Sequence, residues 1–142
     1  MDIFASLKIS SSAMAAQRSR IDVVSSNLAN IETTQTPDGG PYQKRDVVFR
    51  SVPSQDRSFD RILGNIIQGV EVAEIRKNPA PPKLVHDPSH PDADAKGFVA
   101  MPNMNLMEEM VDLMTATRSY EANVTAIQSA KRMALKALEI GR

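Results

Sequence analysis

The chain has 142 residues with 17 basic and 17 acidic side chains, and this zero net charge does not favour nucleic-acid binding. Only 4% of the residues are aromatic and none is cysteine, which excludes disulfides and thiolate metal sites and argues against a core built on large rings. The sequence has no Sec-type signal peptide and no apolar run of about 18 residues, so it predicts a cytosolic protein unless another export route exists.

The first predicted element is a helix from about Ile3 to Asn30. Fourteen of the fifteen glycines and prolines lie between Pro37 and Pro102, so this tract is uninterrupted. A spacing of seven, typical of a coiled coil, relates Leu7, Met14, Ile21 and Leu28. Packing on a globular core is the alternative, but the middle of the chain holds little apolar sequence to form such a core.

A polar motif ends this helix. It consists of Ser26, Asn27, Leu28, Ala29, Asn30 and, three positions on, Thr33. The two asparagines can bond backbone groups where a helix frays. An ordinary polar helix end explains each residue singly but does not predict their order.

The run Ser-Asn-Leu-Ala-Asn-x-x-Thr, preceded by residues 15–21, resembles the N-terminal signature of the bacterial flagellar rod and hook proteins. The stretch 34–41, inserted before Tyr42, is similar to the proximal rod branch of that family.

The middle of the chain predicts short strands and turns. The expected strands are Tyr42–Phe49, Ile66–Arg76, Lys83–His86 and Phe98–Met101, where apolar and β-branched residues alternate or cluster. Residues 51–60 are polar and aperiodic, and we expect a mobile loop there. These strands suffice for a small sheet and not for an independent domain.

The last predicted element is a helix from Leu106 to Ile140, a stretch without glycine or proline. Asn105 is placed to cap it, with Glu108 three residues later as in a capping box. At 1.5 Å per residue the helix is roughly 50 Å long, too long to be buried within its own chain. One apolar stripe is expected at Met107, Met110, Met114, Tyr120, Val124, Ile127, Ala134 and Leu138. Because the apolar residues of the first turns point in several directions, an interface with other chains is expected as well.

The predicted fold is mainly α with a small β part, and elongated. Residues 1–33 and 103–142 form long helices in an antiparallel coiled-coil hairpin, and the β-rich middle segment 34–102 lies at one end. In the predicted register the residue numbers of facing pairs add up to about 141, which places Met14 beside Ile127 and Ile21 beside Tyr120. A shift by one heptad is the main competing register.

Residues 86–94 are the best candidate for a chemical site, because two histidines and three aspartates lie in this loop. They could ligate zinc in principle. However, no other ligand cluster supports a metal site, and the calcium-loop pattern fails at Lys96 and Asn103. We therefore predict no catalytic residue, no metal, no cofactor and no small-molecule substrate. A soluble helical binding module that uses this Asp/His loop is the alternative function.

The flagellar resemblance covers nearly the whole chain and is weakest at 51–65. It extends to residues 69–72, 87–95, 101–106 and 120–123. It implies a structural subunit of the proximal rod that transmits torque, leaves the cytoplasm uncleaved through the flagellar type III export apparatus and assembles in the periplasmic space. The implied partners are further copies, the rod proteins FlgB, FlgF and FlgG, and the rod-base adaptor FliE. The residues expected at assembly contacts are Leu7, Met14, Ile21, Ser26, Asn27, Leu28, Ala29, Asn30, Thr33, Met107, Met110, Met114, Tyr120, Asn123, Val124 and Ile127.

Overall fold

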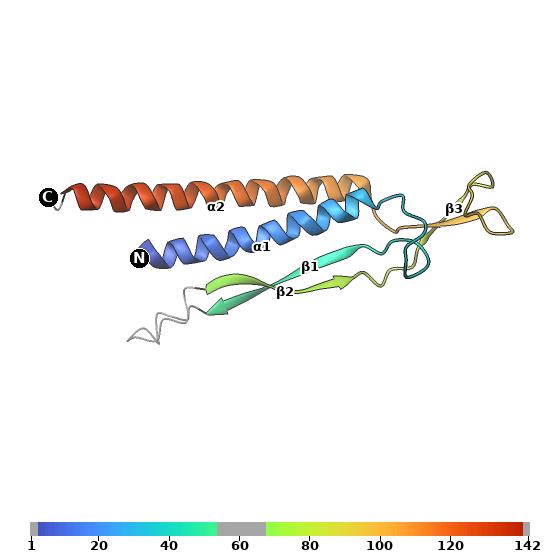
Figure 1. The fold of residues 1–142 in the computed structure, drawn as a ribbon, viewed down its shortest axis with the longest axis horizontal. Coiled ribbons are helices and arrows are strands. Elements are labelled where there is room, and N and C mark those ends of the chain that lie inside the picture. Colours follow the sequence, from blue (N-terminus) through green and yellow to red (C-terminus); the bar gives the residue numbers. More distant parts are fainter. Residues whose placement is uncertain (1–2, 54–67, 141–142) are drawn as a thin grey trace.

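The structure, a computed structural model, describes residues 3–53 and 68–140. Its elements in chain order are α1 (Ile3–Ala29), β1 (Arg45–Pro53), β2 (Gln68–Lys77), β3 (Lys83–His86), β4 (Phe98–Met101) and α2 (Leu106–Ile140). The two helices run side by side in opposite directions, and both ends of the chain lie at the same end of an elongated molecule (Figure 1). The expectation of a mainly helical chain with a small antiparallel β part is confirmed, whereas supercoiling of the helix pair stays a prediction.

Helix α1 is the central element of the molecule, because it contacts α2 as well as the strands β1 and β2 (Figure 1). Its buried residues are Ala16, Val23, Val24 and Asn27. The predicted seam residues Leu7, Met14, Ile21 and Leu28 are only half-buried. The heptad prediction assumed one partner, but a helix that packs on two sides buries small residues between them, where elements approach closely.

The register of the helix pair differs from the prediction. Two side-chain pairs join the helices, Asn27 with Glu109 and Arg20 with Asp112, at 3.0 and 3.1 Å. Their residue numbers add up to 136 and 132, not to the predicted 141. Both sums lie nearer to 134, the value for a shift of one heptad. The repeat of both stripes at seven residues is the reason that the sequence pattern did not separate these registers.

Strands β1 and β2 form an antiparallel hairpin with a bulge between Val48 and Phe49. The prediction placed the whole middle segment at one end, but this hairpin runs back along α1 (Figure 1). The side-chain oxygen of Ser12 accepts a hydrogen bond from the backbone amide of Val70 at 3.2 Å. Residues 51–53, expected in a loop, continue β1, and the rest of that expected loop (54–60) lies outside the described residues.

Strands β3 and β4 form a second antiparallel pair, in the residues predicted for them. This pair lies at the end of the molecule opposite the termini (Figure 1). Val99 is fully buried, whereas Leu84 is 67% exposed. Within the described part of the middle segment (34–53 and 68–102), only β3–β4 and the loops near it therefore occupy the place that was predicted for the entire segment.

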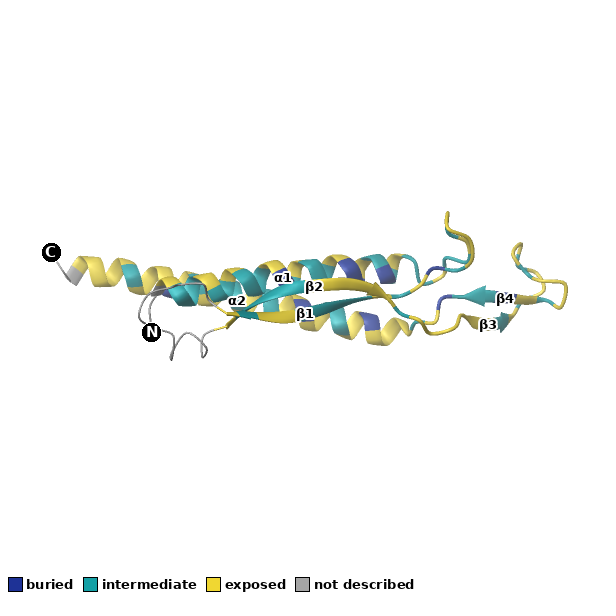
Figure 2. Cartoon of the chain, turned by 90° about the horizontal axis from the view of Figure 1, so that it is seen from below, coloured by how far each residue is buried: buried dark blue, intermediate teal, exposed yellow. Residues whose placement is uncertain are grey.

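Helix α2 begins as predicted, because the amide of Met107 donates to the side-chain oxygen of Asn105 at 3.0 Å. Its buried residues are Glu109, Ala116 and Ala130. The last turns of α2 extend beyond the start of α1 (Figure 1) and are mainly exposed (Figure 2). Within residues 3–53 and 68–140, neither helix combines the length and apolar character needed to cross a membrane.

Candidate functional site

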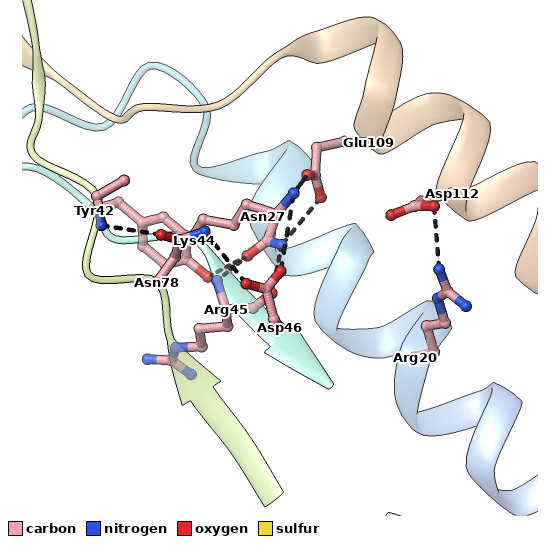
Figure 3. Close-up of polar contacts among 10 residues, drawn as sticks. Arg20, Asn27, Tyr42, Lys44, Arg45, Asp46, Asn78, Glu109 and Asp112 are labelled. Atoms are coloured by element: carbon pink, nitrogen blue, oxygen red, sulfur yellow. Dashed lines mark hydrogen bonds and ion pairs between the residues drawn. The ribbon is translucent and has the colours of Figure 1, made fainter. Parts of the chain in front are cut away.

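A cluster of polar side chains fastens the end of α1 to the start of α2 and to β1 (Figure 3). We call this cluster the polar joint and define it as Asn27, Tyr42, Lys44, Arg45 and Glu109. Asn27 comes from the last turns of α1 and Glu109 from the first turns of α2. The other three residues lie in the segment that enters β1 or at its first position. The joint therefore connects three elements that are far apart in the sequence.

Asn27 is fully buried at the centre of the polar joint. Its amide nitrogen donates to the backbone oxygen of Arg45 at 2.9 Å and to Oε2 of Glu109 at 3.0 Å. Its amide oxygen accepts from the backbone amide of Arg45 at 3.0 Å and from the hydroxyl of Tyr42 at 3.1 Å. Two donors and two acceptor positions are the full capacity of a side-chain amide. No residue type other than asparagine offers both functions at this length, so the joint is specific to it.

Glu109 is the buried charge of the polar joint, with a side chain that is 0% exposed. The ammonium nitrogen of Lys44 lies 2.6 Å from its Oε1, and the side chain of Lys44 is 20% exposed. Partial burial lowers the pKa of Lys44, but the hydrogen bond and charge of Glu109 outweigh it and raise that pKa above 10.5, with smaller help from Asp46 and Asp112. A buried carboxylate needs such a partner, since an unpaired charge in the interior is costly.

The remaining residues of the Ser-Asn-Leu-Ala-Asn-x-x-Thr motif complete the helix end. The side-chain amide of Asn30 donates to the backbone oxygen of Ser26 at 2.8 Å, and the hydroxyl of Thr33 donates to the amide oxygen of Asn30 at 3.2 Å. The backbone amide of Tyr42 donates to the backbone oxygen of Thr33 at 3.0 Å. Ser26, Asn30 and Thr33 therefore share one chain of hydrogen bonds at the end of α1, whereas Asn27 bonds away from it, in the polar joint.

A second contact ties the helices about two turns before the joint on α1 and about one turn after it on α2. The guanidinium of Arg20 donates to Oδ1 of Asp112 at 3.1 Å, and both side chains are partly exposed (Figure 3). Partly exposed pairs contribute little to stability. The fully buried bonds of Asn27 and Glu109 are therefore the ones that fix the relative position of the helices.

The expected assembly residues fall into three groups. Ser26, Asn27, Asn30 and Thr33 lie at or beside the polar joint. Tyr120, Asn123, Val124 and Ile127 of α2 are half-buried, like the four seam residues of α1. Ala29, Met107, Met110 and Met114 are exposed, the last three at 64%, 44% and 54%. Their contacts with other chains stay predictions.

The eight residues predicted as one stripe of α2 do not lie on one face. The step of six residues from Met114 to Tyr120 turns the helix by about 240°, given about 100° per residue. The methionines therefore lie on the outer side of α2, whereas Tyr120 and Ile127 turn toward more buried surroundings. We call the exposed apolar side chains of the first turns, Leu106, Met107, Met110, Val111 and Met114, the outer face.

The Asp/His loop uses its side chains in its own turns. Asp87 accepts bonds from the hydroxyl and amide of Ser89, which lower the pKa of this exposed carboxyl. Nδ1 of His90 accepts from the amide of Asp92, and the ring of His86 stands edge-on to Phe98. In the described part of the chain, no three histidine or acidic side chains form a group that could hold a metal ion.

Sequence reasoning missed Lys44 and Glu109. In the sequence, Glu109 and its neighbour Glu108 suit the positive end of the helix dipole equally well, but Glu108 is exposed. One signal separates the two: Glu109 lies seven residues before Ala116 and fourteen before Asn123, on the face turned toward α1. A charged residue at a seam position predicts a buried partner, although it does not say which one.

Comparison with known proteins gives the same family along the whole chain. Residues 7–35 match the family described as "Flagella basal body rod protein", and residues 95–140 match "Flagellar basal body rod FlgEFG protein C-terminal". The flagellar basal-body rod protein FlgC of Borreliella burgdorferi is 46% identical, over 99% of this chain and 98% of its own. The proteins of that name from Bacillus subtilis (47%, all of both chains) and Salmonella typhimurium (43%, 94% of both chains) are similar to it as well.

Proposed function

The chain belongs to the FlgC family of flagellar basal-body rod proteins, and on this basis we propose that it is a structural subunit of the proximal rod that transmits torque by rigid packing of helices. The relatives that match it carry the name of a rod protein and not of an enzyme. A role in the basal-body rod follows from the family, whereas the position in the proximal rod and the transmission of torque are the proposal.

The outer face of α2 is the observation that carries the proposal. Five large apolar side chains at one end of a long helix are between 44% and 64% exposed. Such a group on one surface marks an interaction site. Methionine suits contacts with neighbours that differ slightly in position, because its thioether chain is flexible and polarisable. A helical assembly requires such contacts on every subunit.

The polar joint supplies the second property that a drive shaft needs, which is resistance to bending between helix pair and hairpin. Its buried bonds fix α1, α2 and β1 to one another through Asn27 and Glu109. We propose that the helices pack as an antiparallel coiled coil in the rod, with the half-buried residues of both stripes covered by neighbouring subunits.

The partners and the location form the finer part of the proposal. Assembly with other rod components follows from the family. We infer that the chain contacts further copies, FlgB, FlgF, FlgG and the adaptor FliE, after export through the flagellar type III apparatus into the periplasmic space. The absence of cysteine is compatible with export of an unfolded chain, because no disulfide has to be broken first.

Deletion and complementation test this function. Loss of the gene should abolish motility and stop the hook–basal body at the rod stage, and a plasmid copy should restore both. Electron microscopy of isolated basal bodies reports the stage of arrest. Normal filaments in the deletion strain would overturn the assignment.

A further inference from the structure

The last turns of α2 present apolar and basic side chains that no other described part of the chain covers. Met133, Leu135 and Leu138 are 60%, 52% and 71% exposed, and this part of α2 extends past the start of α1 (Figure 1). Lys131, Arg132 and Lys136 are exposed in the same turns. Glu139, which pairs with Lys136 at 2.8 Å, is the one acid of this segment. We call residues 131–139 the C-terminal overhang.

A shallow groove of about 440 Å³ lies at the other end of α2. It is lined by Lys44, Met107, Glu108, Val111 and Asp112, so its wall is apolar and two of its residues are acidic. Lys44 is held by Glu109, and Asp112 by Arg20. Among the described residues Glu108 has no ion-pair partner, and it gives the groove a net negative charge. We call this site the Met107–Val111 groove.

We propose that the C-terminal overhang of one copy docks in the Met107–Val111 groove of a second copy. The overhang is apolar and carries a net positive charge, and the groove is apolar and carries a net negative one, so the two surfaces are complementary in both respects. A helix binds in an apolar groove by burying the apolar side chains that face it, and charges at the margin of the groove pair with those of the helix.

The proposed contact is head-to-tail, because groove and overhang are different surfaces of the same chain. A copy that has one of its two surfaces occupied still presents the other one. Contacts of this type continue in one direction as a ring or a helix instead of closing as a two-fold dimer. The inference rests on the proposed function, since it names the contact by which two subunits of the rod would join.

Paired single cysteines test the contact in this cysteine-free chain. Val111→Cys and Leu138→Cys, on chains with different epitope tags, are expressed together in cells that assemble basal bodies and are then oxidised mildly. Both positions are exposed, so neither change disturbs the fold. A disulfide dimer that carries both tags is the expected result. The matched control pairs Thr125→Cys, at an exposed position farther along α2, with Leu138→Cys and should give no such dimer.

The charges give an independent readout. Glu108→Lys in the Val111→Cys chain should lower the yield of the mixed dimer severalfold, and Lys136→Glu in the Leu138→Cys chain should restore it. Absence of the mixed dimer in motile cells would overturn the proposed contact and leave the rod function intact. Dimers of Val111→Cys alone, or adducts only with another protein, would likewise overturn docking of a second copy. The deletion strain tests the rod function separately. Complete basal bodies in that strain would show that the proposed rod function is wrong.

Discussion

The polar joint and the outer face of α2 differ in a way that reverses the usual distribution of side chains. The joint completely buries an asparagine of α1 and a glutamate of α2, whereas the outer face exposes leucine, valine and three methionines within the first turns of α2. Apolar residues buried in this chain are mostly alanine and valine. The chain thus fixes its own shape by specific hydrogen bonds between buried polar groups, and under the proposed function its exposed large apolar side chains would contact other subunits.

The largest effect is expected at the centre of the joint. Asn27→Asp removes the donor to the backbone oxygen of Arg45 and places a second carboxylate where the amide now lies 3.0 Å from Glu109. We expect the free energy of unfolding, measured by urea titration with circular dichroism, to fall by about 3–5 kcal/mol.

The same substitution at Asn30 is the matched control for Asn27→Asp. Asn30 is half-buried and its amide donates to one backbone oxygen at the helix end, so Asn30→Asp should cost about 1–2 kcal/mol. Equal losses at the two positions would mean that the joint has no special role in the stability of the chain.

The ion pair of the joint predicts a dependence on alkaline pH. Because Glu109 raises the pKa of Lys44 in the folded chain, the pair stabilises the fold fully below pH 10.5, the unfolded pKa, and this contribution is lost as the pH rises through the folded pKa. Lys44→Met should cost about 3 kcal/mol at neutral pH, since Glu109 would stay buried without a partner.

Above pH 10.5 the difference in unfolding free energy between Lys44→Met and the unchanged chain should shrink. Lys77→Met is the control, because Lys77 pairs with Asp38 at the surface and should contribute nearly nothing at any pH. A constant difference between the Lys44 variant and the unchanged chain up to pH 12 would contradict the ion pair as its cause.

A smaller effect is expected where β2 meets α1. A Cβ atom at Gly69 would lie 3.1 Å from the side-chain oxygen of Ser12, and that oxygen is held by the oxygen of Ile9 and the amide of Val70. Gly69→Ala should therefore destabilise the chain by about 1–2 kcal/mol in the same urea titration. Ser12→Ala in the same chain makes room for the methyl group, so the two losses should be less than additive. Full additivity would show that the close approach of Gly69 to Ser12 carries no strain.

Most of the architecture could be predicted from the sequence, because it depends on local signals. The distribution of glycine and proline gave both helices, and Asn105 gave the start of α2 to within one residue. The strands β3 and β4 were predicted in full. The hairpin along α1 was not predicted, since its contact depends on a small oxygen at Ser12 facing a glycine, and neither residue carries a signal of its own.

The polar joint could be predicted only in part. The motif predicted that Asn27 and Asn30 bond to backbone groups at the end of the helix. Asn30 does so, because its amide donates to the backbone oxygen of Ser26. Asn27 instead bonds to β1 and α2, through partners up to 82 residues away. A pattern of spacing cannot reveal such partners, because the turn geometry that brings Lys44 to Glu109 is set by the folded chain. The predicted register of the two helices was wrong for a similar reason. Because the apolar stripes repeat every seven residues, two registers that differ by one heptad fit the sequence equally well.

The smallest effect on the stability of the isolated chain is expected at the outer face. This effect is also the sharpest test of the difference between the outer face and the polar joint. Met110→Ser together with Met114→Ser replaces two side chains that are 44% and 54% exposed, so the free energy of unfolding should change by less than about 0.5 kcal/mol. In the rod these methionines would lie against neighbouring subunits, and their loss should reduce swimming and the number of complete basal bodies. Thr125→Ala, at an exposed polar position of α2, should change neither quantity. Normal swimming of the double variant would place the assembly contacts elsewhere, whereas a large loss of stability would show that these methionines serve the fold of the chain itself.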